Sequence, residues 1–268
     1  MLAADSRVTL NAQIQTLPGV PPLILPSFFD NATKLLKVKS QKYVGAITYG
    51  VGSIGTPQQA RTAHSYLPEF EATLTDDPLT VEGFAQRLSE FFLARWNDAH
   101  MPNPAPPGQD MVFLVGGYDD DQAAYGRVFE FYIPSRPIPN ETLPGGQFGA
   151  TWGGQAEIAS RLVLGYDPRT TGVVREFFHS PVQAELVGQP DPLDVELKNK
   201  LQAPIPWQFL PLQDCVDLSI FLIRSTIAMQ KWIIALRGVG GAIDVATITR
   251  TEGFQYVQQK KICGEVTK

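Results

Sequence analysis

Cysteine and histidine are scarce in this sequence, which has two cysteines and three histidines among its 268 residues. Cys215 and Cys263 form no Cys-x-x-Cys motif, and His64, His100 and His179 are scattered, so no zinc-site spacing occurs. We therefore expect no metal and no cofactor. We expect two reduced thiols, and a disulfide stays open because the sequence does not fix the distance between the cysteines.

Long blocks of one charge and long apolar runs are also missing. Charged residues make up 18% of the chain and the net charge is -5, with both signs mixed. A basic surface for nucleic acid is therefore not expected. The most apolar stretch, 218–229, is interrupted by Arg224 and is too short to span a bilayer, and no signal peptide is visible. We expect no nucleic-acid partner, no membrane partner and a cytoplasmic location.

Motifs of common enzymes are missing as well. The sequence contains no phosphate loop and no GxSxG nucleophile elbow. Residues 50–55 (GVGSIG) match GxGxxG after an expected strand, but no acidic residue follows at the position that a dinucleotide site requires. The three aspartates at 119–121 are interpreted as a solvated turn, because no further ligands follow at the spacing of a calcium loop.

Apolar periodicity, caps and turn residues predict a chain of clustered strands and paired helices. A proline-rich loop is expected at 18–26. Expected strands cover 1–10, 35–38, 43–51, 111–118, 125–133, 148–152, 243–248 and 254–262. Expected helices cover 57–74, 81–99, 155–165, 194–200 and 212–232.

Hairpins that alternate with paired helices indicate two antiparallel sheets with helices outside. The expected fold class is α+β, a four-layer α/β/β/α sandwich. We expect one domain over 1–268, with an insertion at about 167–206 whose apolar content is too low for a core of its own. The helix at 212–232 is apolar on so many sides that we expect it to lie between layers or at a subunit interface.

Five segments carry a resemblance through their order and spacing: 2–9 (LAADSRVT), 31–38 (NATKLLKV), 44–50 (VGAITYG), 112–119 (VFLVGGYD) and 240–248 (GGAIDVATI). Together they resemble the proteasome β-type family of N-terminal nucleophile (Ntn) hydrolases and its bacterial relatives. The resemblance covers roughly 1–165 and 210–262. It implies the same four-layer sandwich, a threonine-type peptidase ancestry, a peptide substrate and self-association into a homo-oligomer.

The resemblance also implies roles for two residues. In the family, an N-terminal threonine attacks the peptide, its α-amine acts as the base, and a lysine held by an aspartate supports it through its positive charge. Asp5 matches the aspartate and Lys34 the lysine. We expect their side chains to lie close together on adjacent strands.

The nucleophile itself has no counterpart, because the family's threonine begins the strand before Leu2 and only Met1 precedes Leu2 here. A strand and a turn need about a dozen residues. A Ser-Gly pair of the family is replaced at 152–154 (WGG), and an aspartate and a serine are absent from 236–241 (LRGVGG). We expect the chain as given to be inactive.

Three interpretations stay open. The chain is a peptidase-like subunit whose true start lies upstream, a non-catalytic structural subunit of an oligomer, or a soluble α+β binding domain with an apolar pocket. An upstream in-frame strand that carries a threonine, serine or cysteine would favour the first.

Overall fold

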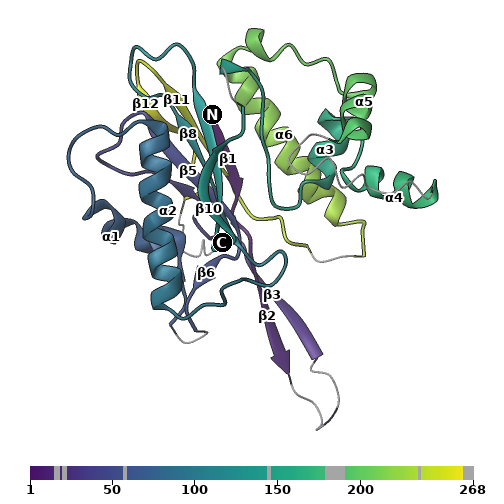
Figure 1. Ribbon diagram of the computed structural model, residues 1–268, viewed down its shortest axis with the longest axis horizontal. Coiled ribbons are helices and arrows are strands. Elements are labelled where there is room, and N and C mark those ends of the chain that lie inside the picture. Colours follow the sequence, from purple (N-terminus) through teal and green to yellow (C-terminus); the bar gives the residue numbers. More distant parts are fainter. Residues whose placement is uncertain are drawn as a thin grey trace, which may run out of the picture.

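The computed structural model of the chain describes residues 1–14, 19, 23–56, 59–143, 146–178, 191–234 and 237–261. It is a mixed α/β structure whose sheets are antiparallel (Figure 1). This agrees with the expected α+β class.

The larger sheet has five strands in the order β10-β9-β8-β5-β4. The bounds of these strands are β4 Leu35–Leu36, β5 Val44–Gly50, β8 Met111–Gly117, β9 Arg127–Ile133 and β10 Arg136–Glu141. Every residue of β8 is buried, as its continuous apolar run predicts for a strand covered on both faces. The hairpin of β8 and β9 confirms the pair expected at 111–118 and 125–133.

The smaller sheet has the order β1-β11-β12, from Leu2–Asp5, Ile243–Thr249 and Gly253–Gln258. It packs on one side of the larger sheet, where β1 and β12 contact β5. A Cβ atom at Gly45 of β5 would lie 2.4 Å from the ring of Phe254. The small residues of β5 therefore let the two sheets approach closely.

Helices cover the outer sides of these sheets (Figure 1). Helix α2 (Val81–Asp98) packs on β8, β9 and β10, and its N-terminal amides are capped by Thr80, which accepts from the Gly83 N–H. Its buried side includes Phe84, Leu88 and Trp96, as the helical spacing predicts. Helix α6 (Leu212–Gln230) packs on β1 and β11, and α3 (Glu157–Val163) packs on α6.

The remaining elements are short or peripheral. They are β2 (Val8–Ile14), β3 (Leu23–Phe29), β6 (Ser53–Ile54), β7 (Arg61–Thr62), η1 (Ala63–Tyr66), α1 (Leu67–Glu71), α4 (Arg169–Phe177), α5 (Pro192–Leu201) and η4 (Trp207–Phe209).

The N-terminal segment differs from the expected single strand at 1–10. It breaks at Ser6 and Arg7 into β1 and β2, which belong to different sheets. The break arises because the side chain of Ser6 is buried and its hydroxyl donates a hydrogen bond to the Asp30 carbonyl. The loop expected at 18–26 is also wrong in part, since β3 begins at Leu23. Among the described strands, β3 pairs only with β2, so its other edge is free. Pro26 is tolerated in β3 because a proline can occupy such an edge strand.

The helix expected at 57–74 is wrong over most of its length. Residues 57 and 58 lie outside the described part, and the chain then forms β7, η1 and the short helix α1. Arg61 explains this arrangement, because its guanidinium donates to the Ser65 carbonyl and lies 4.0 Å over the Tyr66 ring. The Arg61 side chain thus satisfies the Ser65 carbonyl, which would accept from a backbone N–H in a longer helix.

The strand expected at 148–152 does not form. Conversely, β10 was not expected, because its two prolines are typical of a loop. Pro137 and Pro139 are acceptable there because β10 is the edge strand of its sheet. The buried hydroxyl of Ser89 in α2 donates to the Pro137 carbonyl, which fixes the helix on this edge.

Two further features concern the second half of the chain. The helix expected at 194–200 is confirmed as α5, while α4 was unexpected, and neither helix has a buried residue. Helix α6 is confirmed as a helix but is not enclosed, because its side away from β11 is exposed.

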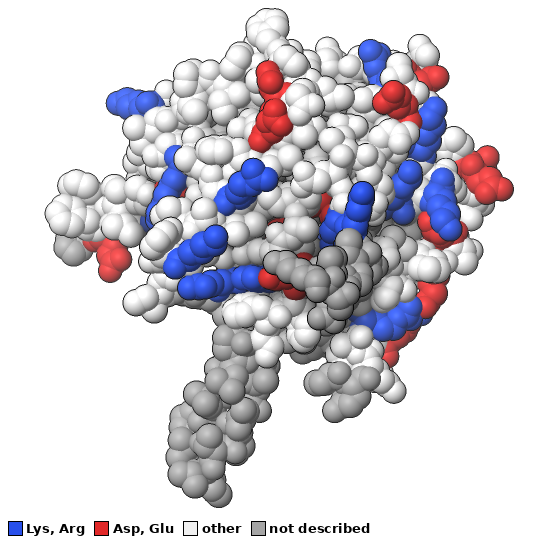
Figure 2. Space-filling model, turned by 180° about the vertical axis from the view of Figure 1, so that it is seen from behind, with Lys and Arg blue, Asp and Glu red and all other residues white. Residues whose placement is uncertain are grey.

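Charge is dispersed over the face of the molecule that Figure 2 shows. In Figure 2, basic and acidic side chains are interspersed with wide uncharged areas on the face shown. Over the residues with described positions, no helix has both the length and the apolar character needed to cross a membrane.

Candidate functional site

Asp5 stands at the end of β1, where the chain leaves the smaller sheet. Its Oδ2 atom accepts from the backbone N–H groups of Arg7 and Gly240, each at 3.0 Å. Its Oδ1 atom accepts from Lys34 Nζ at 2.7 Å. Three donors from three separate segments therefore hold this carboxylate in one orientation.

Lys34 comes directly before β4 in the larger sheet. The N–H of Thr48 donates to the Lys34 carbonyl at 3.0 Å, so the pairing of β4 with β5 extends to Lys34. The side chains of Lys34 and Asp5 are 16% and 12% exposed. The structure thus brings together the two residues that the resemblance singled out, as an ion pair that links the two sheets and is mostly shielded from water.

A second ion pair supports the first. The guanidinium of Arg7 binds both carboxylate oxygens of Asp30, at 2.6 and 2.7 Å, and also donates to the Arg237 carbonyl. This hydrogen-bonded pairing raises the pKa of Arg7 and lowers the pKa of Asp30. The segments before Lys34 and after Asp5 are therefore tied together next to the site.

The glycine-rich segment before β11 closes over this arrangement. A Cβ atom at Gly240 would lie 2.4 Å from Arg7 Cζ, and one at Gly241 would lie 2.5 Å from the Asp30 carbonyl oxygen. Gly241 also has φ +74°, which favours glycine. Gly240 and Gly241 belong to the stretch that lacks the family's aspartate and serine. This stretch thus contacts Asp5 through a backbone N–H group, that of Gly240.

Sequence reasoning missed these contributions of Arg7, Asp30 and Gly240. Their contacts join residues far apart in the chain, and backbone donors leave no residue-type signal. The only usable signal was the pair of adjacent glycines at 240 and 241.

The terminal amine of the chain does not lie at this site. Met1 directly precedes β1 and Asp5 ends it, so the two residues are about 13 Å apart at about 3.3 Å per residue. Burial against α6 lowers the pKa of this amine. Asp5 and Lys34 therefore have no α-amine beside them in the structure.

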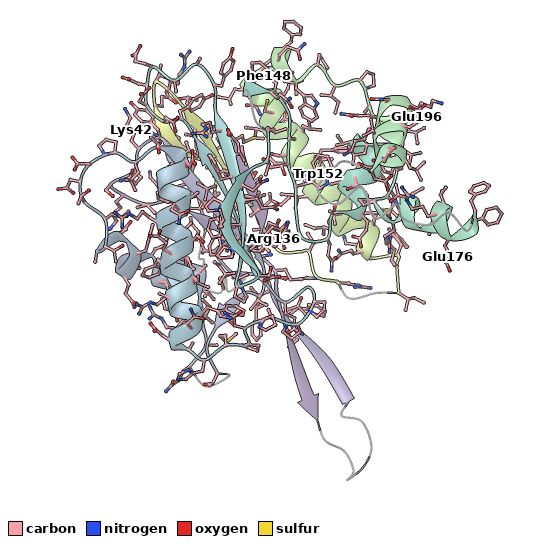
Figure 3. The ribbon with its side chains drawn as sticks, in the orientation of Figure 1. Lys42, Arg136, Phe148, Trp152, Glu176 and Glu196 are labelled. Atoms are coloured by element: carbon pink, nitrogen blue, oxygen red, sulfur yellow. The ribbon has the colours of Figure 1, made fainter. Side chains whose placement is uncertain are left out.

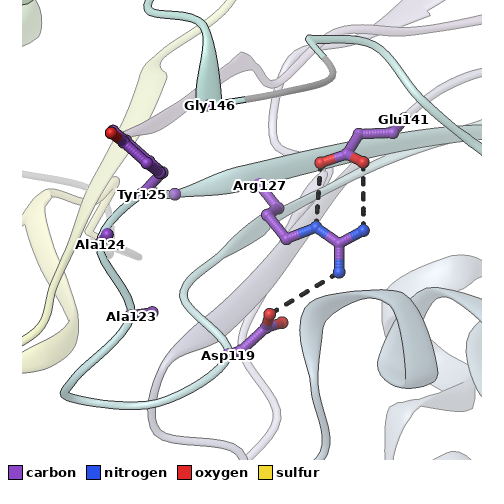
Figure 4. Close-up of a pocket in the computed structure, with 8 residues that line it drawn as sticks. Asp119, Ala123, Ala124, Tyr125, Arg127, Glu141 and Gly146 are labelled. Atoms are coloured by element: carbon purple, nitrogen blue, oxygen red, sulfur yellow. Dashed lines mark hydrogen bonds and ion pairs between the residues drawn. The ribbon is translucent and has the colours of Figure 1, made fainter.

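A pocket of about 350 Å³ lies at the other end of the larger sheet (Figure 4). Arg127 fills one side of it and pairs with Glu141 at 2.9 Å, with Glu82 at 3.1 Å and with Asp119 at 3.7 Å. Asp119 also accepts from the Val81 N–H at the start of α2. These partners hold the charged groups of the pocket, whose lining also includes the apolar side chains of Ala123 and Ala124 and the ring of Tyr125.

The other residues that the sequence analysis singled out do not contact Asp5 or Lys34 in the described contacts. Trp152 is labelled in Figure 3, and its indole N–H donates to Ser160 in α3 at 3.0 Å. Cys215 is a free, partly buried thiol, while Cys263 and His179 lie outside the described residues. Where positions are described, no cluster of three or more metal-ligating side chains occurs.

Comparison with models of protein families finds no match, and a search of curated proteins finds no relative. Any function for this chain therefore has to be inferred from the site itself.

Proposed function

We propose that the chain is a proteasome-like subunit related to threonine-type peptidases, with Asp5 and Lys34 in the supporting positions. The observation that carries the proposal is the contact of 2.7 Å between Lys34 Nζ and Asp5 Oδ1. A fixed ammonium beside a nucleophile favours its deprotonated form, which is the role of the lysine in the family. Asp5 is the positioning residue that keeps Lys34 in place.

The order of packing supports the four-layer α/β/β/α sandwich of the Ntn hydrolases. Helix α2 contacts the larger sheet, the smaller sheet contacts its other side, and α6 contacts the smaller sheet. The proposed four-layer arrangement requires contacts of this kind. The insertion at about 167–206 includes α4 and α5, which bury no residue of their own.

The nucleophile of the proposed site would come from a strand beside β1. β1 is the edge strand of its sheet, so no other described strand occupies its outer edge. Such an edge can accept one more strand. In this proposal the nucleophile is a threonine, serine or cysteine at the start of such a strand.

The alternative is a non-catalytic structural subunit of a homo-oligomer. The exposed apolar side of α6 favours it, because apolar surface of this kind marks contact sites between proteins. In this case the Asp5–Lys34 pair has a structural role alone. We propose no metal, cofactor, nucleic acid or membrane for either candidate.

Hydrolysis of fluorogenic acyl-peptide substrates tests the peptidase proposal. The coding DNA upstream of Met1 is read first, and the chain is then produced as given and with its upstream in-frame residues. We expect turnover only from the extended chain, and a loss of about 10²-fold or more with Lys34→Ala. The matched control is Lys260→Ala, which breaks another shielded ion pair, with Asp244, on the smaller sheet. An upstream in-frame stop codon, or an extended chain equally impaired by both substitutions, would contradict the proposal.

A further inference from the structure

The pocket of about 350 Å³ at the end of the β8–β9 hairpin has two sides of different chemistry (Figure 4). One side is made by small and aromatic residues of the hairpin loop, Ala123, Ala124 and Tyr125. The other side carries charged groups, those of Asp119, Arg127 and Glu141. Pockets for small molecules measure about 300–1,000 Å³ and combine apolar surface with a few fixed polar groups. This pocket therefore has the size and the mixed lining of a small-molecule site.

Arg127 is fixed on the charged side by ion pairs that use only part of its guanidinium. Its Nε and Nη2 atoms donate to Glu141 at 2.9 and 3.1 Å, and Nη2 also donates to Glu82 at 3.1 Å. The Nη1 atom donates no hydrogen bond to a described residue. It lies 3.7 Å from Asp119 Oδ2, which is too long for a hydrogen bond. The N–H groups of Nη1 are therefore available to a ligand.

Asp119 is also fixed through one of its two oxygens. Its Oδ1 atom accepts from the Val81 N–H at 2.9 Å, at the start of α2. Its Oδ2 atom accepts no hydrogen bond from a described residue. A donor, Arg127 Nη1, and an acceptor, Asp119 Oδ2, thus lie side by side in the pocket lining with unused hydrogen-bonding capacity. A ligand that pairs with both must present an acceptor next to a donor.

Tyr125 supplies a flat apolar surface on the other side. Its ring is 53% exposed and lies edge to face with the ring of Phe148, with 6.2 Å between the ring centroids. Gly146 contacts the same ring so closely that a Cβ atom there would lie 2.8 Å from it, and the φ of +72° at this position favours glycine. Two neighbours therefore hold the ring, while about half of it stays accessible.

We propose that this pocket binds a small aromatic carboxamide, with its amide group on Asp119 and Arg127 and its ring on the side of Tyr125. In a primary carboxamide the carbonyl oxygen and one N–H share an edge. The oxygen can accept from Arg127 Nη1 while the N–H donates to Asp119 Oδ2. A carboxylate ligand would meet the carboxylates of Asp119 and Glu141, and an amidinium ligand would meet the guanidinium of Arg127, so the arrangement disfavours both charged analogues. This inference goes beyond the peptidase proposal and does not depend on it.

Three ligands of the same shape test the recognition of the amide. The full chain is titrated with benzamide, benzoate and benzamidine, and binding is followed by saturation-transfer NMR. We expect benzamide to bind with a dissociation constant on the order of 1 mM, as its small size allows. We expect the two charged ligands to bind at least about fivefold more weakly. No binding of benzamide, or binding of either charged ligand as tight as that of benzamide, would overturn the proposal.

Substitutions in the lining locate the bound ligand. Asp119→Asn keeps an oxygen for the Val81 N–H and replaces Oδ2 by an NH₂ group that cannot accept, so we expect benzamide to bind about fivefold more weakly or worse. Tyr125→Ala removes the ring and should weaken binding as well. The matched control is Asp121→Asn, the same change in the same turn but outside the pocket lining, which should bind like the parent.

Thermal unfolding of each variant confirms that it folds, and the three ligands on the parent chain decide the proposal even where a variant does not. Equal benzamide affinity in the Asp119→Asn and Asp121→Asn variants would contradict the placement of the amide. Peptide hydrolysis is measured independently, so failure here leaves the peptidase proposal standing.

Discussion

Lys34 Nζ and Asp5 Oδ1 lie 2.7 Å apart although 29 positions separate the two residues in the chain. The contact joins the smaller sheet, whose strand β1 ends at Asp5, to the larger sheet, whose edge strand β4 begins directly after Lys34. Asp5 also accepts from Gly240, so the segment before β11 is anchored at the same point. One carboxylate therefore organises three segments, and its removal should affect all three.

Removing either partner of this pair should destabilise the fold unequally. Asp5→Ala leaves the Lys34 ammonium and two backbone N–H groups without their acceptor, and we expect a loss of about 3–5 kcal/mol in the free energy of unfolding. Lys34→Ala leaves Asp5 with its two backbone donors, and we expect about 1–3 kcal/mol. Urea unfolding of both variants measures the difference.

The double variant provides the control for this prediction. If the two residues act through their contact, the loss in Asp5→Ala with Lys34→Ala is smaller than the sum of the single losses. Additive losses would show that the contact contributes little to stability.

The glycine at 241 should resist substitution. Gly241→Ala places a methyl group 2.5 Å from the Asp30 carbonyl oxygen at a positive φ, and we expect a loss of at least about 1 kcal/mol. The matched control is Gly172→Ala in α4, where nothing lies within 4 Å of the added Cβ. That substitution should stabilise by about 0.5–1 kcal/mol because alanine favours helix. Thermal unfolding compares the two, and equal effects would contradict the packing around Gly241.

Much of the fold could be predicted from local patterns. Helix α2 carries a clear apolar stripe and a cap at Thr80, and β8 is an uninterrupted apolar run, so both were found from the sequence. β10 was missed because Pro137 and Pro139 are typical of loops, and only its edge position makes them acceptable. The helix expected at 57–74 failed because Arg61 makes local contacts that periodicity does not reveal.

The site was predictable only where side chains carry it. Asp5 and Lys34 were found through their resemblance to the family, and the structure places them in contact. The Gly240 donor is a backbone group, and the Arg7–Asp30 pair depends on how the chain turns between β1 and β2. Such contacts follow from the tertiary fold rather than from spacing in the sequence.

Acid should weaken the chain partly through Asp167. Hydrogen bonds from Arg169, and then from Arg161, lower the pKa of this carboxyl in the folded state. Its contribution is present above the unfolded value of about 3.9 and is lost as the pH falls through the lower folded pKa. We expect Asp167→Asn to be less stable than the parent at pH 7 and to show a shallower fall below about pH 4. Urea unfolding from pH 7 to pH 2 measures both, and parallel curves would contradict the assignment.

Tyr49 should remain protonated in the folded chain well above pH 10. Its hydroxyl donates to Glu130 at 2.5 Å across the face of the larger sheet, and burial, followed by this carboxylate, raises its pKa. Because the folded pKa lies above the unfolded value of about 10, the contribution to stability is present below pH 10 and is lost as the pH rises. Absorbance titration of the parent and Tyr49→Phe should therefore give the same amplitude near pH 10. We also expect Tyr49→Phe to cost about 1.5–3 kcal/mol, because Glu130 loses a donor. A loss of amplitude near pH 10 in Tyr49→Phe would show that the hydroxyl is free to ionise and is not held by Glu130.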